Sequence, residues 1–334
     1  MATYYGTYGQ KVQYLASDPS DPQIGQVWYN STSATLKVRN ATTAGTWASG
    51  GNLTTSLWAV GGAGTQTAAL GFGGYNGTSM SNVTQTYNGT SWTNVPGTLG
   101  TARYLHAGLG TQTAALMATG QGPSPFPAAA EKYDGTSWTS AGNVNQSRRS
   151  LGGAGTQTAG MIMGGGNPSP ISPPSNVENY NGSTWTTGTG LGTARYGGGG
   201  GGTQTAAIYF SGFANPGPPN LTNATEEWNG SSWTAGGNYL TSKGAGGFSG
   251  SQTAGLAYAG ENVGPPFAYV GTDAYNGTSW TSLGSNLSNT RTYQAGSNGT
   301  QAAALAVGGS PGDSFNATEE WTGTVISSKT VTVT

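Results

Sequence analysis

Five basic residues recur at nearly regular intervals along this 334-residue chain: Arg103, Arg148, Arg195, Lys243 and Arg291. An acidic residue follows each of them after 28 to 31 residues: Glu131, Glu178, Glu226, Asp273 and Glu319. Because guanidinium groups bind carboxylates through paired hydrogen bonds, the cations together could bind an acidic glycan or another carboxylate. They could instead form ion pairs with the acids that follow them. A sixth position in the series has Leu57 for the cation and Gln85 for the acid, and this joint loss favours the ion pairs.

A second set of candidate binding residues lies in proline-rich stretches. These stretches hold 13 of the 16 prolines. Proline lowers the entropy that a loop loses when it binds. The same stretches carry the aromatic residues Phe126, Phe213, Phe267, Tyr269 and Phe315. Such rings could stack on sugars or dock on a partner, or they could simply anchor their own loops.

The amino-acid composition argues against most classes of catalytic site. The chain has no cysteine and one histidine, His106, which argues against thiolate catalysis, Cys-ligated zinc and a Ser-His-Asp triad. We expect His106 to pack in the core, and we expect no cofactor and no metal. Glycan cleavage needs two carboxylates about 5–9 Å apart, and the acids of the variable loops are Glu261 and Asp313. A non-enzymatic protein is therefore predicted.

Net charge and hydropathy limit the kinds of partner that are expected for the chain. Charged residues make up 7% of the chain and the net charge is -1, so there is no basic patch for nucleic acid. No apolar run is long enough for a membrane span, and the N-terminus has no signal-like apolar segment. Since 34% of the residues are hydrophobic, a folded core is expected in spite of 60 glycines.

A repeat of about 47 residues organises the chain. A segment close to GTQTAAL recurs six times with spacings of 45 to 49 residues, and its glutamines are Gln66, Gln112, Gln157, Gln204, Gln252 and Gln301. A second segment close to YNGTSW follows, with its aromatic at Tyr87, Tyr133, Tyr180, Trp228 and Tyr275. Its tryptophan comes five residues later, at Trp92, Trp138, Trp185, Trp233 and Trp280. This period matches a β-propeller blade, and helix-forming runs are absent, so an all-β, six-bladed propeller is predicted.

Each repeat divides into four expected strands. The first is rich in small residues, the second is the TAAL-type run, the third ends in the Tyr or Trp, and the fourth begins at the Trp. Asn-Gly or Asp-Gly between the last two, as at Asn88, Asp134 and Asn181, predicts a tight hairpin. The six-glycine run 197–202 is in register with a first strand, where small residues allow close approach.

These features resemble the kelch family of β-propellers. The resemblance covers about residues 44–325 and rests on the Tyr and Trp together with a Gly doublet after the second strand, at Gly73, Gly164 and Gly308. The gap from Tyr to Trp is shorter than is usual in kelch repeats, which implies a two-residue turn.

Closure of the sixth blade has two solutions. The last repeat lacks a fourth-strand Trp, whereas Trp47, before the first repeat, stands in a segment similar to the other fourth strands. We expect the strand near Trp47 to complete the sixth blade. Alternatively, the alternating C-terminal tail is that strand. If Trp47 closes the blade, the tail is free to join a sheet edge or another chain.

Residues 1–42 precede the propeller, which we place at 43–334. They contain a predicted hairpin around Trp28 and resemble short modules in tail-fibre and other virion proteins of bacteriophages, especially marine ones. The resemblance implies an arm that attaches to other virion proteins, a location on the particle or otherwise outside the cell, and a homo-oligomer.

The variable loops would collect on one face of the propeller, away from the constant GTQT and NGTS turns. The expected function is a phage tail fibre, appendage or capsid decoration that displays this face to a host receptor or glycan. A cell-surface or secreted glycan-binding propeller is the alternative, and a glycan-cleaving enzyme comes third.

Overall fold

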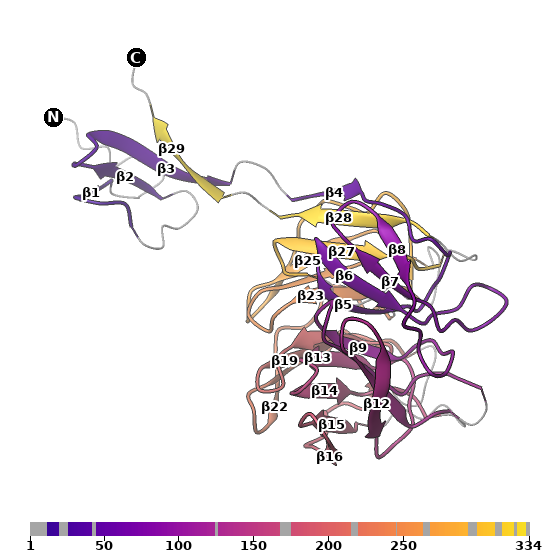
Figure 1. Cartoon of the computed structure of the whole chain (residues 1–334). Coiled ribbons are helices and arrows are strands. Elements are labelled where there is room, and N and C mark those ends of the chain that lie inside the picture. The colour runs from indigo at the N-terminus through magenta and orange to yellow at the C-terminus, as the bar shows by residue number, and fades with distance from the viewer. Residues whose placement is uncertain are drawn as a thin grey trace. The chain divides into compact units, whose positions relative to one another are not determined.

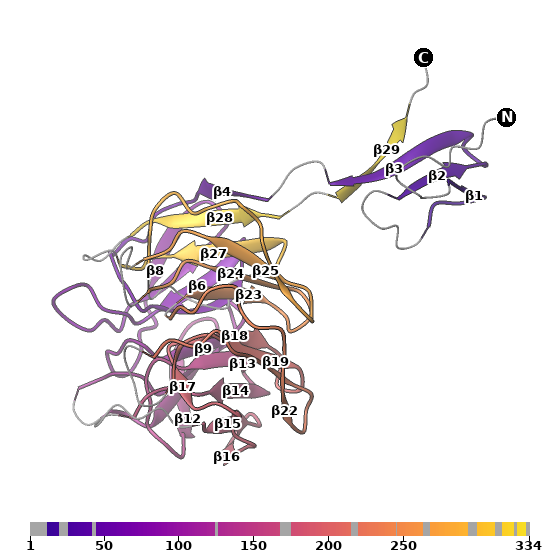
Figure 2. The same ribbon diagram turned by 180° about the vertical axis from the view of Figure 1, so that it is seen from behind.

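The structure, a computed structural model, describes residues 12–19, 26–41, 45–123, 126–167, 175–214, 220–244, 246–262, 268–292, 299–310, 316–323 and 326–331. All regular structure in these residues is β-strand (Figures 1 and 2). The chain divides into two compact units. The arm unit comprises Met1–Gly45 with Gly323–Thr334, and the main unit comprises Thr46–Thr322.

No described segment forms a helix that is long and apolar enough to cross a membrane.

Five antiparallel sheets of four strands make up most of the main unit, consistent with a β-propeller. The first sheet has β5 (Gly61–Thr65), β6 (Ala68–Phe72), β7 (Thr84–Tyr87) and β8 (Trp92–Val95). The second has β9 (Ala107–Gly110), β10 (Ala115–Ala118), β11 (Ala129–Tyr133) and β12 (Trp138–Asn143). The third has β13 (Gly152–Gly155), β14 (Gly160–Met163), β15 (Val177–Tyr180) and β16 (Trp185–Thr187).

The fourth and fifth sheets follow the same order. The fourth has β18 (Gly199–Gly202), β19 (Ala207–Phe210), β21 (Thr225–Trp228) and β22 (Trp233–Ala235), and the fifth has β23 (Gly247–Gly250), β24 (Gly255–Tyr258), β25 (Thr272–Tyr275) and β26 (Trp280–Ser282). The short strands β17 (Arg195–Tyr196) and β20 (Phe213–Ala214) pair beside the fourth sheet. The strand boundaries reproduce the four-strand division expected from the repeat.

A sixth sheet joins distant parts of the chain. It contains β27 (Ala303–Val307), β28 (Thr318–Thr322) and β4 (Thr46–Ser49), with Trp47 directly opposite Trp321. Trp92 is opposite Tyr87 in the same way in the first sheet. The strand near Trp47 therefore takes the fourth-strand place beside β28. The segment that would supply this sheet's first strand lies outside the described residues.

The turn between third and fourth strands is longer than expected. A two-residue turn was predicted, but Asn88–Ser91 forms a four-residue connection between the paired residues Tyr87 and Trp92. The Asn88 Oδ1 atom accepts hydrogen bonds from the backbone N–H of Thr90 (2.9 Å) and Ser91 (2.9 Å). Gly89 has φ 90°, which glycine adopts at little cost. The Asx side chain, and not a two-residue hairpin, thus explains the Asn-Gly-Thr-Ser pattern.

Neighbouring sheets pack face to face through apolar side chains. One cluster combines Leu70 and Phe72 of β6 with Met117 of β10 and Tyr133 of β11. Another combines Ile208 and Phe210 of β19 with Tyr275 and Trp280. The core of the main unit is therefore divided among the interfaces between successive sheets. Successive first strands contact one another in the order β5, β9, β13, β18 and β23, and β27 contacts both β23 and β5.

The glutamine of each GTQT-type turn links its sheet to the preceding one. The Gln204 Nε2 atom donates to the carbonyls of Gly160 (2.9 Å) and Tyr180 (2.9 Å), in the second and third strands of the third sheet. The same pair of bonds recurs for Gln112, Gln157, Gln252 and Gln301. Gln66 donates to the carbonyls of Ala304 (3.2 Å) and Trp321 (2.7 Å) in the sixth sheet.

The arm unit is a small sheet built from both ends of the chain. Its strand order is β1 (Gln13–Leu15), β2 (Val27–Asn30), β3 (Thr35–Ala41) and β29 (Ile326–Val331). The C-terminal tail pairs with β3 along this edge. Asp18 accepts hydrogen bonds from the side chains of Lys37 (2.7 Å), Asn30 (2.7 Å) and Trp28 (3.0 Å). These bonds lower the pKa of the Asp18 carboxyl to about 2.

Candidate functional site

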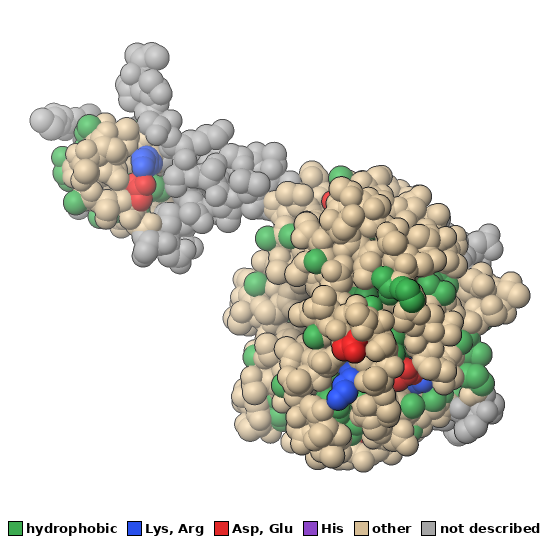
Figure 3. Space-filling view, viewed as in Figure 1, with side chains coloured by type: hydrophobic (Ala, Val, Ile, Leu, Met, Phe, Trp, Pro, Cys, Tyr) green, Lys and Arg blue, Asp and Glu red, His purple; other side chains and the backbone are tan. Residues whose placement is uncertain are grey.

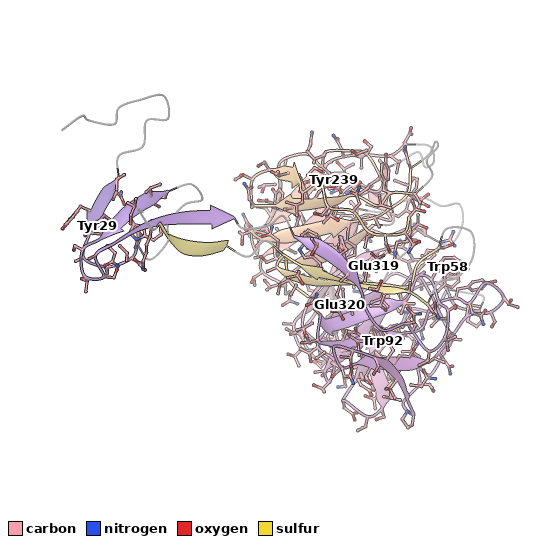
Figure 4. The ribbon with its side chains drawn as sticks, turned by 90° about the horizontal axis from the view of Figure 1, so that it is seen from above. Tyr29, Trp58, Trp92, Tyr239, Glu319 and Glu320 are labelled. Atoms are coloured by element: carbon pink, nitrogen blue, oxygen red, sulfur yellow. The ribbon has the colours of Figure 1, made fainter. Side chains whose placement is uncertain are left out.

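The repeating cations are buried in ion pairs with the acids of their own repeat. Arg148 and Glu178, with side chains 0% and 1% exposed, lie 2.9 Å apart. Arg103 and Glu131 lie 3.0 Å apart, Arg195 and Glu226 lie 2.8 Å apart, and Arg291 pairs with Glu319, which Figure 4 labels on β28. The expected ion pairs are confirmed for these four arginines. Their burial removes them from any ligand-binding surface, so the alternative of a basic binding ring is not supported.

Three of the four ion pairs also hold two loops each, whereas Arg195 donates to the carbonyl of Tyr209 within β19. The Arg148 Nη1 atom donates to the carbonyls of Gly164 (2.9 Å) and Asn176 (2.6 Å), at the two ends of the loop between β14 and β15. Glu178 accepts from the backbone N–H of Asn145 (2.6 Å), in the connection that leads into β13. The pair therefore fixes both variable connections of its sheet. In the first sheet, Gln85 holds the incoming connection without a cation, by accepting hydrogen bonds from Thr54.

Lys243 departs from this rule. Its partner by sequence, Asp273, accepts a hydrogen bond from the Tyr239 hydroxyl, and the Lys243 ammonium lies over the Tyr239 ring, 4.7 Å from the centroid. Tyr269 is also nearby, with its ring centroid 5.8 Å from the ammonium. Burial lowers the pKa of Lys243 to about 8, and the nearby Asp273 carboxylate only partly opposes this. The fifth repeat thus holds a buried cation that, among the described residues, packs on an aromatic ring and forms no ion pair.

Lys243 should make stability rise with pH between about 8 and 10. Because its pKa is about 8 in the folded chain and 10.5 for an unperturbed lysine, the unfolded chain binds more protons in this interval. We expect the free energy of unfolding to rise by about 1–2 kcal/mol over this interval, measured by urea denaturation. Above pH 10 the sign reverses, since burial raises the pKa of tyrosines such as Tyr258 to about 12.

Lys243→Arg is the control for that pH dependence. An arginine stays protonated across the interval, so the variant should lose the rise while the tyrosine-dependent fall remains. A rise of equal size in the variant would show that another group titrates.

The predicted loop aromatics separate into three groups. Phe213 is buried and stacks on Tyr196 with ring centroids 5.1 Å apart, so it anchors its own loop. Phe126 is half-buried beneath the Arg149 guanidinium, 5.5 Å from the ring centroid, and Tyr269 is half-buried near Lys243. Phe267 and Phe315 lie outside the described residues, as do most of the loop prolines.

A more variable position comes directly after each cation position. Its residues are Trp58, Tyr104, Arg149, Tyr196, Gly244 and Thr292. Each pairs through an antiparallel bridge with a residue that follows the end of the second strand: Tyr75, Gln121, Gly166, Phe213, Glu261 and Ser310. We call the side chains of Trp58, Tyr75, Tyr104, Gln121, Arg149, Tyr196, Phe213 and Glu261 the rim.

One part of the rim is an aromatic cluster. Trp58 lies among the connecting loops in Figure 4, and its ring centroid is 5.4 Å from that of Tyr75 and 5.2 Å from that of Tyr104. Tyr75 and Tyr104 are themselves 5.2 Å apart. All three side chains are half-buried, so they keep surface that solvent can reach. This is the type of surface on which sugar rings or apolar side chains pack.

The other part of the rim is polar. The Arg149 Nη1 atom donates to the Gln121 Oε1 atom, which joins the second and third repeats. The charge of Arg149 acts to lower the pKa of both Tyr104 and Tyr196, although burial raises both overall. Glu261 acts on Tyr196 in the opposite direction. The Arg149–Gln121 hydrogen bond and the contact between Trp58 and Tyr104 show that residues of the first three repeats converge on one region.

Backbone hydrogen bonds hold the rim residues in place. Ala59, Leu105 and Ser150, each one residue beyond a rim position, have φ of 52°, 55° and 54°. The N–H of Leu105 donates to the carbonyl of Ala59 (3.3 Å), and that of Ser150 donates to Leu105 (2.8 Å). Left-handed backbone at residues other than glycine is uncommon and persists where the surroundings fix it. The same residues, with first-strand residues such as Gly108 and Gly200, line a cavity of about 100 Å³.

The described residues do not form a metal site. No group of three or more His, Cys, Asp or Glu side chains is placed to hold a metal among them. His106 is buried and stacks on Phe72 with centroids 5.4 Å apart, and burial lowers its pKa to about 3. Glu261 belongs to the rim, whereas Asp313 lies outside the described part of the chain.

Sequence reasoning missed most of the rim. It selected the buried cation in each repeat, but the residue next to it carries the variable side chain. The signal was present in the segments SLWAV, TARYLH, SRRSL and TARYGG, where one position changes between Trp, Tyr and Arg.

No protein-family model matches the chain, and no curated protein matches it at a significant level.

Proposed function

We propose that the main unit is a six-bladed β-propeller of the kelch type, closed by β4. Three observations support closure. Gln66 donates to carbonyls of β27 and β28, as the other five glutamines do to their preceding sheets. The Gly309 N–H, in the last repeat, donates to the carbonyl of Leu57 in the first repeat (3.3 Å). The Gly74 N–H donates to the carbonyl of Arg103 in the next repeat (2.8 Å) in the equivalent way. The Trp47 Nε1 atom donates to Thr272 Oγ1 in the third strand of the fifth sheet (2.8 Å). The Trp92 Nε1 atom likewise donates to Thr318 Oγ1 in the third strand of the sixth sheet (2.9 Å), so each Trp bonds to the preceding sheet.

We further propose that the protein is a non-enzymatic virion component, such as a tail fibre, appendage or capsid decoration, that recognises a host receptor or glycan. The rim is the observation that carries the recognition part, since it gathers aromatic and hydrogen-bonding side chains from several repeats. The virion part rests on the resemblance of residues 1–42 to phage modules. On this proposal the arm unit binds other virion proteins and copies of the chain. A cell-surface or secreted glycan-binding propeller would use the same rim.

Binding by the full chain to bacterial surface polysaccharides, measured on a glycan array, should depend on the rim. We expect Tyr196→Ala and Gln121→Ala each to weaken binding about tenfold, equivalent to about 1.4 kcal/mol. Each substitution removes a rim side chain that is proposed to contact the ligand. We also expect the polysaccharide to keep its length during incubation, because the protein is proposed to lack catalytic activity.

Tyr14→Ala supplies the control, because Tyr14 is an aromatic residue of the arm unit that is 74% exposed. Its binding should equal that of the unchanged chain. Equal loss in all three variants, or no loss in the rim variants, would contradict recognition by the rim. Mass spectrometry of purified phage particles tests the virion part, and absence of the chain from them would overturn that assignment alone.

A further inference from the structure

The charge balance of the rim indicates which glycans it accepts. The five repeating cations would have given a strongly basic surface, but four form buried ion pairs and Lys243 is itself buried. Among the described rim residues, the charged side chains are Arg149 and Glu261, one of each sign. Figure 3 shows a main unit whose visible face carries few charged side chains.

The remaining loop sequence does not restore a positive charge. The segments 124–125, 168–174, 215–219, 263–267, 293–298 and 311–315 contain no lysine or arginine, and their one acid is Asp313. An anionic polysaccharide would therefore meet described rim residues whose net charge is zero. Arg149 is also engaged already, since it donates to Gln121 and covers Phe126.

The uncharged part of the rim has the chemistry of a sugar site. Trp58, Tyr75 and Tyr104 offer ring surface, on which the C–H faces of a pyranose can pack. The amide of Gln121 and the hydroxyls of Tyr104 and Tyr196 can exchange hydrogen bonds with sugar hydroxyls. Stacking and hydrogen bonding by these uncharged groups do not require the ligand to carry a charge.

We propose that the rim binds neutral saccharides, with Trp58 and Tyr104 as the stacking residues, and that it discriminates against uronic-acid and other anionic glycans. This inference rests on the proposed function and specifies its ligand class. Since no net charge is neutralised on binding, affinity is nearly independent of salt.

The test compares neutral oligosaccharides with uronic-acid oligosaccharides of the same length, by calorimetry or array titration with the full chain. We expect binding of neutral members, a change in Kd of less than twofold between 50 and 500 mM NaCl, and about tenfold loss in Trp58→Ala and in Tyr104→Ala. The tenfold losses are expected because ring stacking supplies most of the affinity. The small effect of salt is expected because salt screens only charge–charge interactions, which contribute little here.

Several outcomes would overturn the inference. Preference for the anionic series, or a Kd that rises tenfold with salt, would leave glycan recognition standing but refute the neutral class. Binding of no glycan by the unchanged chain would refute the proposed recognition function itself. The salt titration needs no variant, so the test holds even where Trp58→Ala folds poorly, and Tyr14→Ala again serves as the unaffected control.

Discussion

Gln204→Ala should lower the free energy of unfolding of the chain by about 2–3 kcal/mol. The substitution removes the two hydrogen bonds that Gln204 donates to Gly160 and Tyr180, and it leaves both carbonyls without this donor at the interface between the third and fourth sheets. A buried acceptor that loses its partner costs more than the net value of the hydrogen bond. Urea denaturation followed by tryptophan fluorescence measures the change.

Thr205→Ala is the matched control, since Thr205 is exposed in the same turn, and it should change stability by less than about 0.5 kcal/mol. Gln66→Ala then tests closure. Because Gln66 bonds to Ala304 and Trp321 in the sixth sheet, its loss should equal that of Gln204→Ala if the ring is closed. A loss less than half as large for Gln66→Ala would mean that the first and sixth sheets separate easily.

Arg148→Leu should destabilise the chain by about 3–5 kcal/mol. The side chain of Glu178 is 1% exposed, so removal of the cation leaves a buried carboxylate with backbone N–H groups as its remaining described partners. The carbonyls of Gly164 and Asn176 also lose their donor. Urea denaturation at pH 7 is again the measurement.

The first repeat supplies the control for this ion pair. It has Leu57 and Gln85 at the two positions, and Gln85 holds the incoming connection through Thr54. The double variant Arg148→Leu with Glu178→Gln copies that arrangement, so it should recover at least half of the lost stability. If the double variant is as unstable as Arg148→Leu, the carbonyl contacts of Arg148, and not the buried charge, determine its contribution.

The ion pairs could be predicted from the sequence because both partners recur in register and disappear together at Leu57 and Gln85. Trp47 could be placed beside the last repeat for a similar reason, since its local segment matches the other fourth strands. The length of the turn after Tyr87 could not be predicted. Its length depends on the Asn88 side chain replacing a backbone hydrogen-bond partner, and spacing alone does not distinguish this from a two-residue hairpin.

The candidate site was harder to predict because periodicity identifies constant residues first. Phe213 was one of five loop rings expected either to contact a ligand or to anchor its own loop, and its stacking on Tyr196 supports anchoring. Trp58 and Tyr104 were overlooked because they come from successive repeats and contact each other only when the sheets pack. Residues that share a surface across repeats are separated in sequence by about one period, so their types vary without an obvious rule.

The sequence by itself determined the period, the strand division and the pairing of each repeating arginine with an acid, because these depend on local hydrogen bonding and on contacts within one repeat. Tertiary structure decided which cations remain available to a ligand, how each GTQT glutamine bonds to the preceding sheet, and which side chains meet at the rim. Those features depend on packing between sheets, which buries one residue and exposes its neighbour in the chain.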